Sequence, residues 1–87
     1  MLIKVVDANY VKGHEIEITF NDGFHATIDL KDHLQGEIFK PQRSEAFFRN
    51  FRLNRWTIEW ENGADFAPEF LHELALKESK GTQNTGV

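Results

Sequence analysis

The stretch Glu15-Ile-Glu-Ile-Thr-Phe-Asn-Asp-Gly-Phe-His-Ala-Thr-Ile-Asp-Leu30 decides the fold. Its first half alternates polar and apolar residues, which places Ile16, Ile18 and Phe20 on one face of a half-buried strand. The next residues, 21–23, are Asn-Asp-Gly, and this composition is typical of a tight hairpin turn. The second half alternates in the same way, so the stretch predicts a β-hairpin with one face toward a core.

A second stretch of the chain repeats this pattern. Trp56-Thr-Ile-Glu-Trp60 alternates, Glu61-Asn-Gly63 supplies a turn, and Ala64-Asp-Phe66 follows as a brief strand. The alternation predicts that Trp56, Ile58 and Trp60 point inward and that Thr57 and Glu59 point outward. The echo between the two stretches has two explanations that stay open, an old duplication and two hairpins obeying the same turn chemistry.

The remaining segments predict two more strands and two helices. Residues 2–10 read as a first strand, in which Val6 interrupts the alternation. Residues 51–53 read as the start of a fourth strand, with Asn54-Arg55 as its turn. Ser44 has the character of an N-cap for a short helix over 45–50, and Phe47, Phe48 and Phe51 are predicted core residues. Pro68 suits the first turn of a helix that we expect to end near Ser79.

Together these elements predict an α+β fold. It has a small, mainly antiparallel sheet built from two hairpins, with a short middle helix and a C-terminal helix packed on one face. At 87 residues the chain predicts one domain. We expect that domain to cover residues 1–80, and the polar, Gly-containing residues 81–87 to form a disordered tail.

The composition indicates a globular protein of a reducing compartment. Hydrophobic residues make up 40% and charged residues 28% of the chain, and cysteine is absent, which excludes disulfides and thiolate chemistry. No signal peptide is recognisable at the N-terminus, and no apolar run approaches the roughly 18 residues that a membrane span needs. We therefore expect a cytoplasmic protein with no membrane contact.

Charge is unevenly distributed along the chain. The net charge is −4, yet the segment from Pro41 to Arg55 carries four Arg and one Glu, which is a local charge of +3. Such asymmetry is typical of a binding surface, although a solvated face is the simpler interpretation. The segment also interleaves Arg with aromatic residues, as a nucleic-acid stacking platform does, but the net acidic charge argues against phosphate binding.

No constellation of residues reaches the signature of a catalytic or metal site. The densest candidate for a metal site is His25, Asp29, Asp32 and His33, but His25 and Asp29 lie about 13 Å apart along one strand. The Gly residues lie singly in turns rather than in a phosphate-binding loop. Ser44 has the character of a helix cap and Ser79 lies at a helix end, so neither is a candidate nucleophile. We expect no catalytic residue, no metal and no cofactor, and thus no enzyme.

Several short motifs resemble one known family. Phe20-Asn-Asp-Gly23, Asp29-Leu30, Phe48, Trp60-Glu-Asn-Gly-Ala-Asp65 and Ala67-Pro-Glu-Phe-Leu71 are similar to the bacterial domain of unknown function numbered 2442, over roughly residues 5–74. Many members have Pro where this chain has Glu61. The resemblance implies a small α+β unit of a bacterial protein. In some members it implies a gene neighbour encoding a small basic partner, in a toxin–antitoxin arrangement.

These observations lead to three hypotheses of function. The first is a non-enzymatic protein-interaction module, antitoxin-like, whose partner is another protein and in particular a small basic one. The second is a nucleic-acid-contacting regulator that uses the segment Arg43–Arg55, and the third is a small-ligand-binding domain. A homodimer is a further partner hypothesis. The candidate surface residues are Glu15, Glu17 and Glu59 on outward strand positions, and Arg49, Arg52 and Arg55 in the basic segment.

Overall fold

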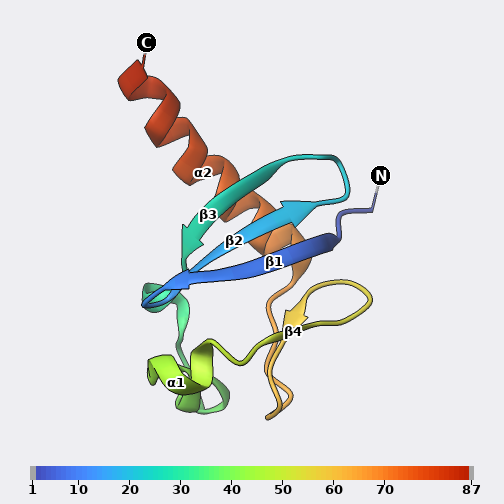
Figure 1. The fold of residues 1–87 in the computed structure, drawn as a ribbon, viewed down its shortest axis with the longest axis vertical. Coiled ribbons are helices and arrows are strands. Elements are labelled where there is room, and N and C mark those ends of the chain that lie inside the picture. The colour runs from blue at the N-terminus through green and yellow to red at the C-terminus, as the bar shows by residue number, and fades with distance from the viewer. Residues whose placement is uncertain (1, 87) are drawn as a thin grey trace.

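The computed structural model describes the backbone of residues 2–86 and the side chains of residues 2–78. The fold is α+β, as the sequence predicts: a three-stranded antiparallel sheet, a second sheet of two strands, and a C-terminal helix (Figure 1). In chain order the elements are β1 (Val5–Lys12), β2 (Glu15–Phe20), β3 (His25–Asp29), three 3₁₀ turns (Lys31–His33, Glu37–Phe39, Pro41–Arg43), α1 (Glu45–Phe48), β4 (Arg52–Leu53), β5 (Ile58–Glu59) and α2 (Pro68–Gly86).

The larger sheet has the strand order β1-β2-β3, so β2 is its central strand. Ile16 pairs with Tyr10 on one side and with Ile28 on the other. Ile16, Ile18 and Ile28 are completely buried, which confirms the predicted alternation. The first strand begins later than expected, at Val5, and its register shifts between Val5 and Asp7. This bulge places Val6 out of the alternation and explains the irregularity seen in the sequence.

Both predicted turns have the same backbone geometry. The N–H of Gly23 donates to the Phe20 carbonyl, and the N–H of Gly63 donates to the Trp60 carbonyl. Both glycines have φ near +89°, where a side chain would be strained. A side-chain oxygen of the preceding residue, Asp22 or Asn62, accepts the N–H that follows the glycine. The two stretches thus share one turn chemistry, a type I turn closed by a glycine bulge.

The second hairpin is shorter than predicted. Its first strand is reduced to β5, which pairs with β4 and, after the turn, makes a single bridge between Glu59 and Asp65. The N–H of Val5 bonds to the Trp56 carbonyl at 2.8 Å and links this region to β1. The predicted inward position of Trp56 is wrong, because its side chain is 44% exposed, whereas Thr57 is buried. The cause is Asn54, whose Oδ1 accepts the N–H groups of Trp56 and Thr57 at 2.7 Å and bends the chain into a loop instead of a strand.

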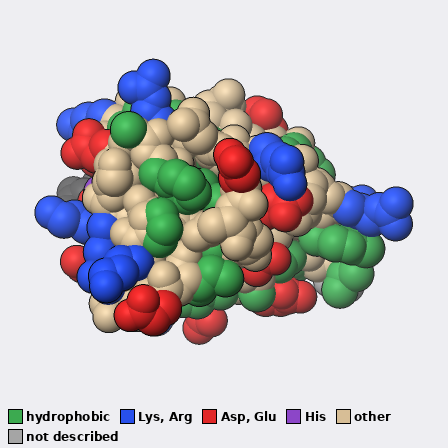
Figure 2. Space-filling model, turned by 90° about the horizontal axis from the view of Figure 1, so that it is seen from below, with side chains coloured by type: hydrophobic (Ala, Val, Ile, Leu, Met, Phe, Trp, Pro, Cys, Tyr) green, Lys and Arg blue, Asp and Glu red, His purple; other side chains and the backbone are tan. Residues whose placement is uncertain are grey.

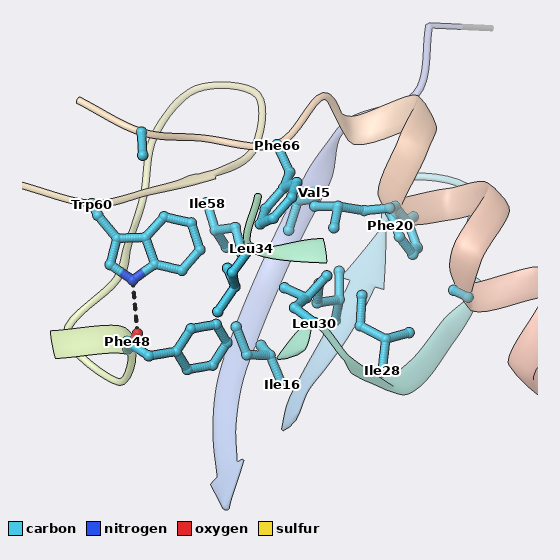
Figure 3. Close-up of a cluster of buried hydrophobic side chains, with 14 residues drawn as sticks. Val5, Ile16, Phe20, Ile28, Leu30, Leu34, Phe48, Ile58, Trp60 and Phe66 are labelled. Atoms are coloured by element: carbon cyan, nitrogen blue, oxygen red, sulfur yellow. Dashed lines mark hydrogen bonds between the residues drawn. The ribbon is translucent and has the colours of Figure 1, made fainter. Parts of the chain in front are cut away.

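The core joins both sheets through aromatic side chains (Figure 3). Trp60 is 1% exposed, and its ring centroid lies 5.5 Å from that of Phe48 and 6.0 Å from that of Phe66. Its indole Nε1 donates a 2.7 Å hydrogen bond to the Phe48 carbonyl. Phe48 itself is fully buried, with Phe47 and Phe51 packed against the core, so the predicted core role of these phenylalanines is confirmed.

The short helix α1 begins after Ser44, as predicted. However, no hydrogen bond from the Ser44 side chain caps it. The first helical N–H of the ladder, that of Phe48, bonds to the Ser44 carbonyl instead. The residue therefore stands at the N-cap position without providing the expected side-chain cap.

The C-terminal helix α2 crosses behind the three-stranded sheet (Figure 1). Leu71 and Ala75 are buried and join the core, while His72 packs edge-on against Phe20 at 4.7 Å between ring centroids. The helix is described as far as Gly86, beyond the predicted end at Ser79. Val87 lies outside the described residues, and the division into a domain of residues 1–80 and a disordered tail of residues 81–87 stays a prediction.

Candidate interaction surfaces

One face of the three-stranded sheet is open to solvent, because α2 and the core cover the other. Residues that pair directly across strands point to the same face. Glu17 pairs with Asn9 and Thr27, and all three side chains are exposed. The neighbouring rows are Lys12, Glu15 and Asp29, and Asp7, Thr19 and His25.

This open sheet face is predominantly acidic. The paired rows of the described strands carry the carboxylates of Asp7, Glu15, Glu17 and Asp29, and one Lys or Arg, Lys12. Two of the carboxylates, Glu15 and Glu17, are candidate residues of the sequence analysis, and the strand register brings them together with the other two. We call these four carboxylates the acidic face.

Helix α2 extends the negative charge at one end of the acidic face. A carboxylate oxygen of Glu78 accepts the N–H of Asp29 at 3.5 Å. Burial raises the pKa of the Glu78 carboxyl above its ordinary value. The hydrogen bond from the Asp29 N–H and the charge of His33 lower this pKa, and the Asp29 and Glu15 carboxylates raise it. The upward shift of the Glu78 pKa therefore reflects mainly the burial of its carboxyl, with a smaller contribution from the Asp29 and Glu15 carboxylates nearby.

Glu59, the third acidic candidate, lies elsewhere. It belongs to β5 in the second sheet, where its side chain is 26% exposed and lies 3.7 Å from the guanidinium of Arg52. A cross-strand pair of opposite charges explains this position without a partner protein. The outward strand positions therefore form one acidic face on the larger sheet, and Glu59 is not part of it.

The basic candidates make separate contacts with different elements. The Arg49 guanidinium lies over the Tyr10 ring at 5.9 Å from its centroid, and Arg52 pairs with Glu59. Arg55 is exposed in the loop after β4. Arg43, at the start of the segment, donates from Nε to the Leu34 carbonyl at 3.2 Å. The ion pair with Glu59 offsets part of the charge of Arg52, whereas Arg49 keeps its full charge over the Tyr10 ring.

A groove lined by both apolar and polar residues lies where three distant segments meet. Its volume is about 290 Å³, and it is lined by Leu2 and Ile3, by Trp56 in the β4–β5 loop, and by the residues that lead into α2. Figure 2 shows hydrophobic side chains beside charged ones at the right-hand end of the molecule, the end that carries this loop in Figure 1. The sequence pattern does not indicate this site, because the alternation from residue 56 to 60 assigns Trp56 to the core. The sequence predicts a turn at Asn54-Arg55, but it also predicts a strand with Trp56 pointing inward directly after that turn.

A second hollow, of about 380 Å³, lies between the first and third 3₁₀ turns. Its lining includes Lys31, Arg43 and Gln35, together with the carboxylate of Asp32 and the His14 ring. His14 is buried, and its Nε2 lies 3.0 Å from the Gln42 carbonyl. The hollow therefore combines two cationic side chains with an amide donor, next to one opposing charge.

The part of the chain that the structure describes contains neither a cluster of metal-ligating side chains nor a membrane-spanning helix. There, no three side chains of His, Asp or Glu are grouped so that they could hold a metal ion. Within the same residues, no helix combines the length and the apolar character needed to cross a bilayer.

Comparison with known proteins gives one match. The family model described as "Protein of unknown function (DUF2442)" matches residues 5–76, which is most of the chain. No curated protein and no solved structure matches the chain. The matched span begins at the first residue of β1 and ends within α2, so it includes both hairpins and the start of the helix that covers the sheet. The resemblance seen in the turn, core and cap residues is thereby confirmed, and this chain belongs to the DUF2442 family of proteins of unknown function.

Proposed function

We propose that this protein is a non-enzymatic interaction module that binds a basic partner protein through the acidic face. The single observation that carries the proposal is the arrangement of Asp7, Glu15, Glu17 and Asp29 on the open side of the sheet, where Lys12 is the one Lys or Arg in the paired rows of the described strands. A face with one sign of charge steers an oppositely charged partner and selects against acidic ones. The proposal extends to an antitoxin-like role in a bacterial cytoplasm, in which the module binds a small basic protein.

The geometry of the sheet suits such a role. Strand residues on one face are spaced regularly and held by the ladder, so the carboxylates lose little freedom when a partner binds. Glu17 lies on the central strand β2, between Asn9 and Thr27. Polar, uncharged neighbours leave the Glu17 carboxylate free to pair with an incoming Lys or Arg, since a bidentate Arg–carboxylate contact needs room on both oxygens.

Affinity capture with matched variants tests this proposal. Immobilised wild type and the Glu15→Lys/Glu17→Lys variant are incubated with nuclease-treated bacterial lysate, and captured proteins are quantified by mass spectrometry. We expect basic proteins that wild type retains to be depleted about tenfold or more by the variant, because two attractive contacts become repulsive. Circular dichroism and the thermal midpoint establish that the variant is folded.

The control changes net charge equally at another place. Glu37→Lys/Glu61→Lys alters two exposed carboxylates outside the sheet face, and it should keep the captured proteins. Equal loss with both variants would reduce the effect to net charge and contradict a specific face. Retention by the Glu15→Lys/Glu17→Lys variant, or recovery only without nuclease, would overturn the proposal.

A second candidate function, binding of a small anion, is favoured by the hollow lined by Lys31 and Arg43. An Arg and a Lys that converge with an amide donor suit a carboxylate or a phosphate. Thermal-shift titrations with inorganic phosphate and with citrate test this function. Stabilisation that disappears in the Lys31→Gln variant is the expected result, and identical curves for the two proteins exclude the site.

A further inference from the structure

We propose that the groove beside Trp56 is a docking site for a peptide segment that presents an apolar side chain next to a Lys or Arg. The groove collects Leu2 and Ile3 from the N-terminal segment, Trp56 from the β4–β5 loop, and Ala67 and Pro68 at the start of α2. Its volume of about 290 Å³ is enough for one or two side chains. This inference does not depend on the acidic face, which belongs to other residues.

The apolar part of the site rests on side chains that the fold leaves uncovered. Trp56 is 44% exposed and Leu2 is 62% exposed, and they line the same groove. A Trp that lies half in solvent beside other apolar groups has the character of an interface anchor, because burying its ring on binding removes a large area from water. No hydrogen bond of the Trp56 indole N–H is found among the described residues, so a partner carbonyl could accept it.

The loop that carries Trp56 is held in place before any partner arrives. Asn54 accepts the N–H groups of both Trp56 and Thr57, and the Trp56 carbonyl accepts the N–H of Val5 at 2.8 Å. The Thr57 hydroxyl, which is buried, donates to the Phe66 carbonyl at 2.7 Å. These bonds fix both ends of the Trp56 backbone, so binding costs little ordering of the loop.

Charge on the rim of the groove specifies the second feature of the partner. The exposed carboxylates of Asp65 and Glu69 line it, and no cationic side chain does so among the described residues. The start of α2 contributes roughly half a positive charge, which offsets only part of the two negative ones. Lys4 lies over the Trp56 ring at 5.8 Å from its centroid but does not line the groove. A Lys or Arg of the partner is therefore best placed against Asp65 and Glu69, with its apolar neighbour against Trp56.

A phage-displayed library of random dodecapeptides is the probe for this site. The library is selected on immobilised wild-type protein and, in parallel, on the Trp56→Ala variant. We expect wild type to enrich peptides that have an aromatic or branched aliphatic residue adjacent to Lys or Arg, and Trp56→Ala to lose them. An enriched peptide is then synthesised and titrated against the protein while its tryptophan emission is followed. Since Trp60 is already buried, a blue shift on binding reports Trp56.

The variants separate the two features of the proposal. Trp56→Ala should weaken the synthetic peptide about 30-fold or more, as hot-spot residues do, and Asp65→Asn/Glu69→Gln should weaken it about twofold to tenfold at low salt. The matched controls are Ile38→Ala, an exposed apolar residue that does not line the groove, and Glu37→Gln/Glu61→Gln. Both should bind as wild type does, and circular dichroism should show all variants folded.

Three results would overturn the proposal. One is enrichment of the same peptides by wild type and Trp56→Ala. Another is a set of selected peptides without basic residues, whose affinity the Asp65→Asn/Glu69→Gln variant leaves unchanged. The third is a concentration-dependent dimer, seen by light scattering, that the Trp56→Ala variant dissolves, because the groove would then be filled by a second copy of this chain.

Discussion

Replacing Trp60 by Phe tests how the core is held together. Trp60 is 1% exposed and lies among Phe39, Phe48, Phe51 and Phe66, while its Nε1 donates to the Phe48 carbonyl at 2.7 Å. Phe keeps an aromatic ring but removes the donor and part of the volume. The buried Phe48 carbonyl would lose its partner, which costs about 1–3 kcal/mol, and the smaller ring would leave a cavity that costs about 1–2 kcal/mol.

The sum, about 2–5 kcal/mol, is large for a chain of this size. Domains of 87 residues have a free energy of unfolding of about 4–13 kcal/mol. Urea denaturation followed by far-UV circular dichroism measures the difference. Trp56→Phe is the matched control, since Trp56 is half exposed and should cost well under about 1 kcal/mol. A loss for Trp60→Phe below about 1 kcal/mol, or equal to that of the control, would refute the role assigned to this hydrogen bond and cluster.

Three further predictions concern the turns and the buried polar groups. Gly63→Ala should lower the free energy of unfolding by about 1–2 kcal/mol. The reason is the backbone angle φ near +89°, which strains any residue with a Cβ, even though no other atom would contact that Cβ. Urea unfolding measures the loss, and an unchanged midpoint would contradict this prediction. Gln42→Ala should cost about 2–3 kcal/mol in the same assay, since Gln42 is fully buried and its amide donates to Asn62 at 3.0 Å; a cost like that of a surface substitution would contradict it. The N–H of Phe24 and then His72 lower the pKa of Asp22 below 3.8, so its stabilisation is present above that pH and is lost as the pH falls through the folded-state pKa. In thermal melts the gap between wild type and Asp22→Asn should therefore narrow in acid, and parallel curves at all pH values would disprove the linkage.

The first hairpin could be predicted from the sequence because local chemistry alone determines it. Period-two alternation from Glu15 to Phe20 set the buried face, and the turn residues set the register, so the face of Glu15 and Glu17 followed directly. The outward position of Asp29 on the second strand of this hairpin also followed from the alternation, and the register places it opposite Glu15. Asp7 could not be placed on this face, because it reaches it only through the pairing of β1 with β2, and pairing partners are not encoded in the periodicity of one strand.

The second hairpin could not be predicted in the same way, because tertiary contacts override its pattern. Trp56, Ile58 and Trp60 alternate in the sequence with polar residues. The side chain of Asn54, however, accepts the N–H groups of Trp56 and Thr57, and the chain forms a loop there instead of a strand. Glu59 then points to Arg52 of the neighbouring strand instead of joining the larger sheet. Asn54 therefore accounts for the exposure of Trp56. The separate position of Glu59 follows from the pairing of β5 with β4, and this pairing is not encoded in the alternation.

The exposure of Trp56 is not needed to build this fold. Trp60 and the phenylalanines around it fill the core, and Thr57 rather than Trp56 closes it below the loop through its bond to Phe66. A large apolar side chain that contributes little to the core carries a cost, since it exposes hydrophobic area that can drive association. The surrounding structure nevertheless holds its backbone through Asn54 and Val5. The loop holds the apolar side chain of Trp56 in place beside two carboxylates, which suits binding of a partner, whereas the same side chain contributes little to the core. This difference favours a recognition role for the groove over a packing role.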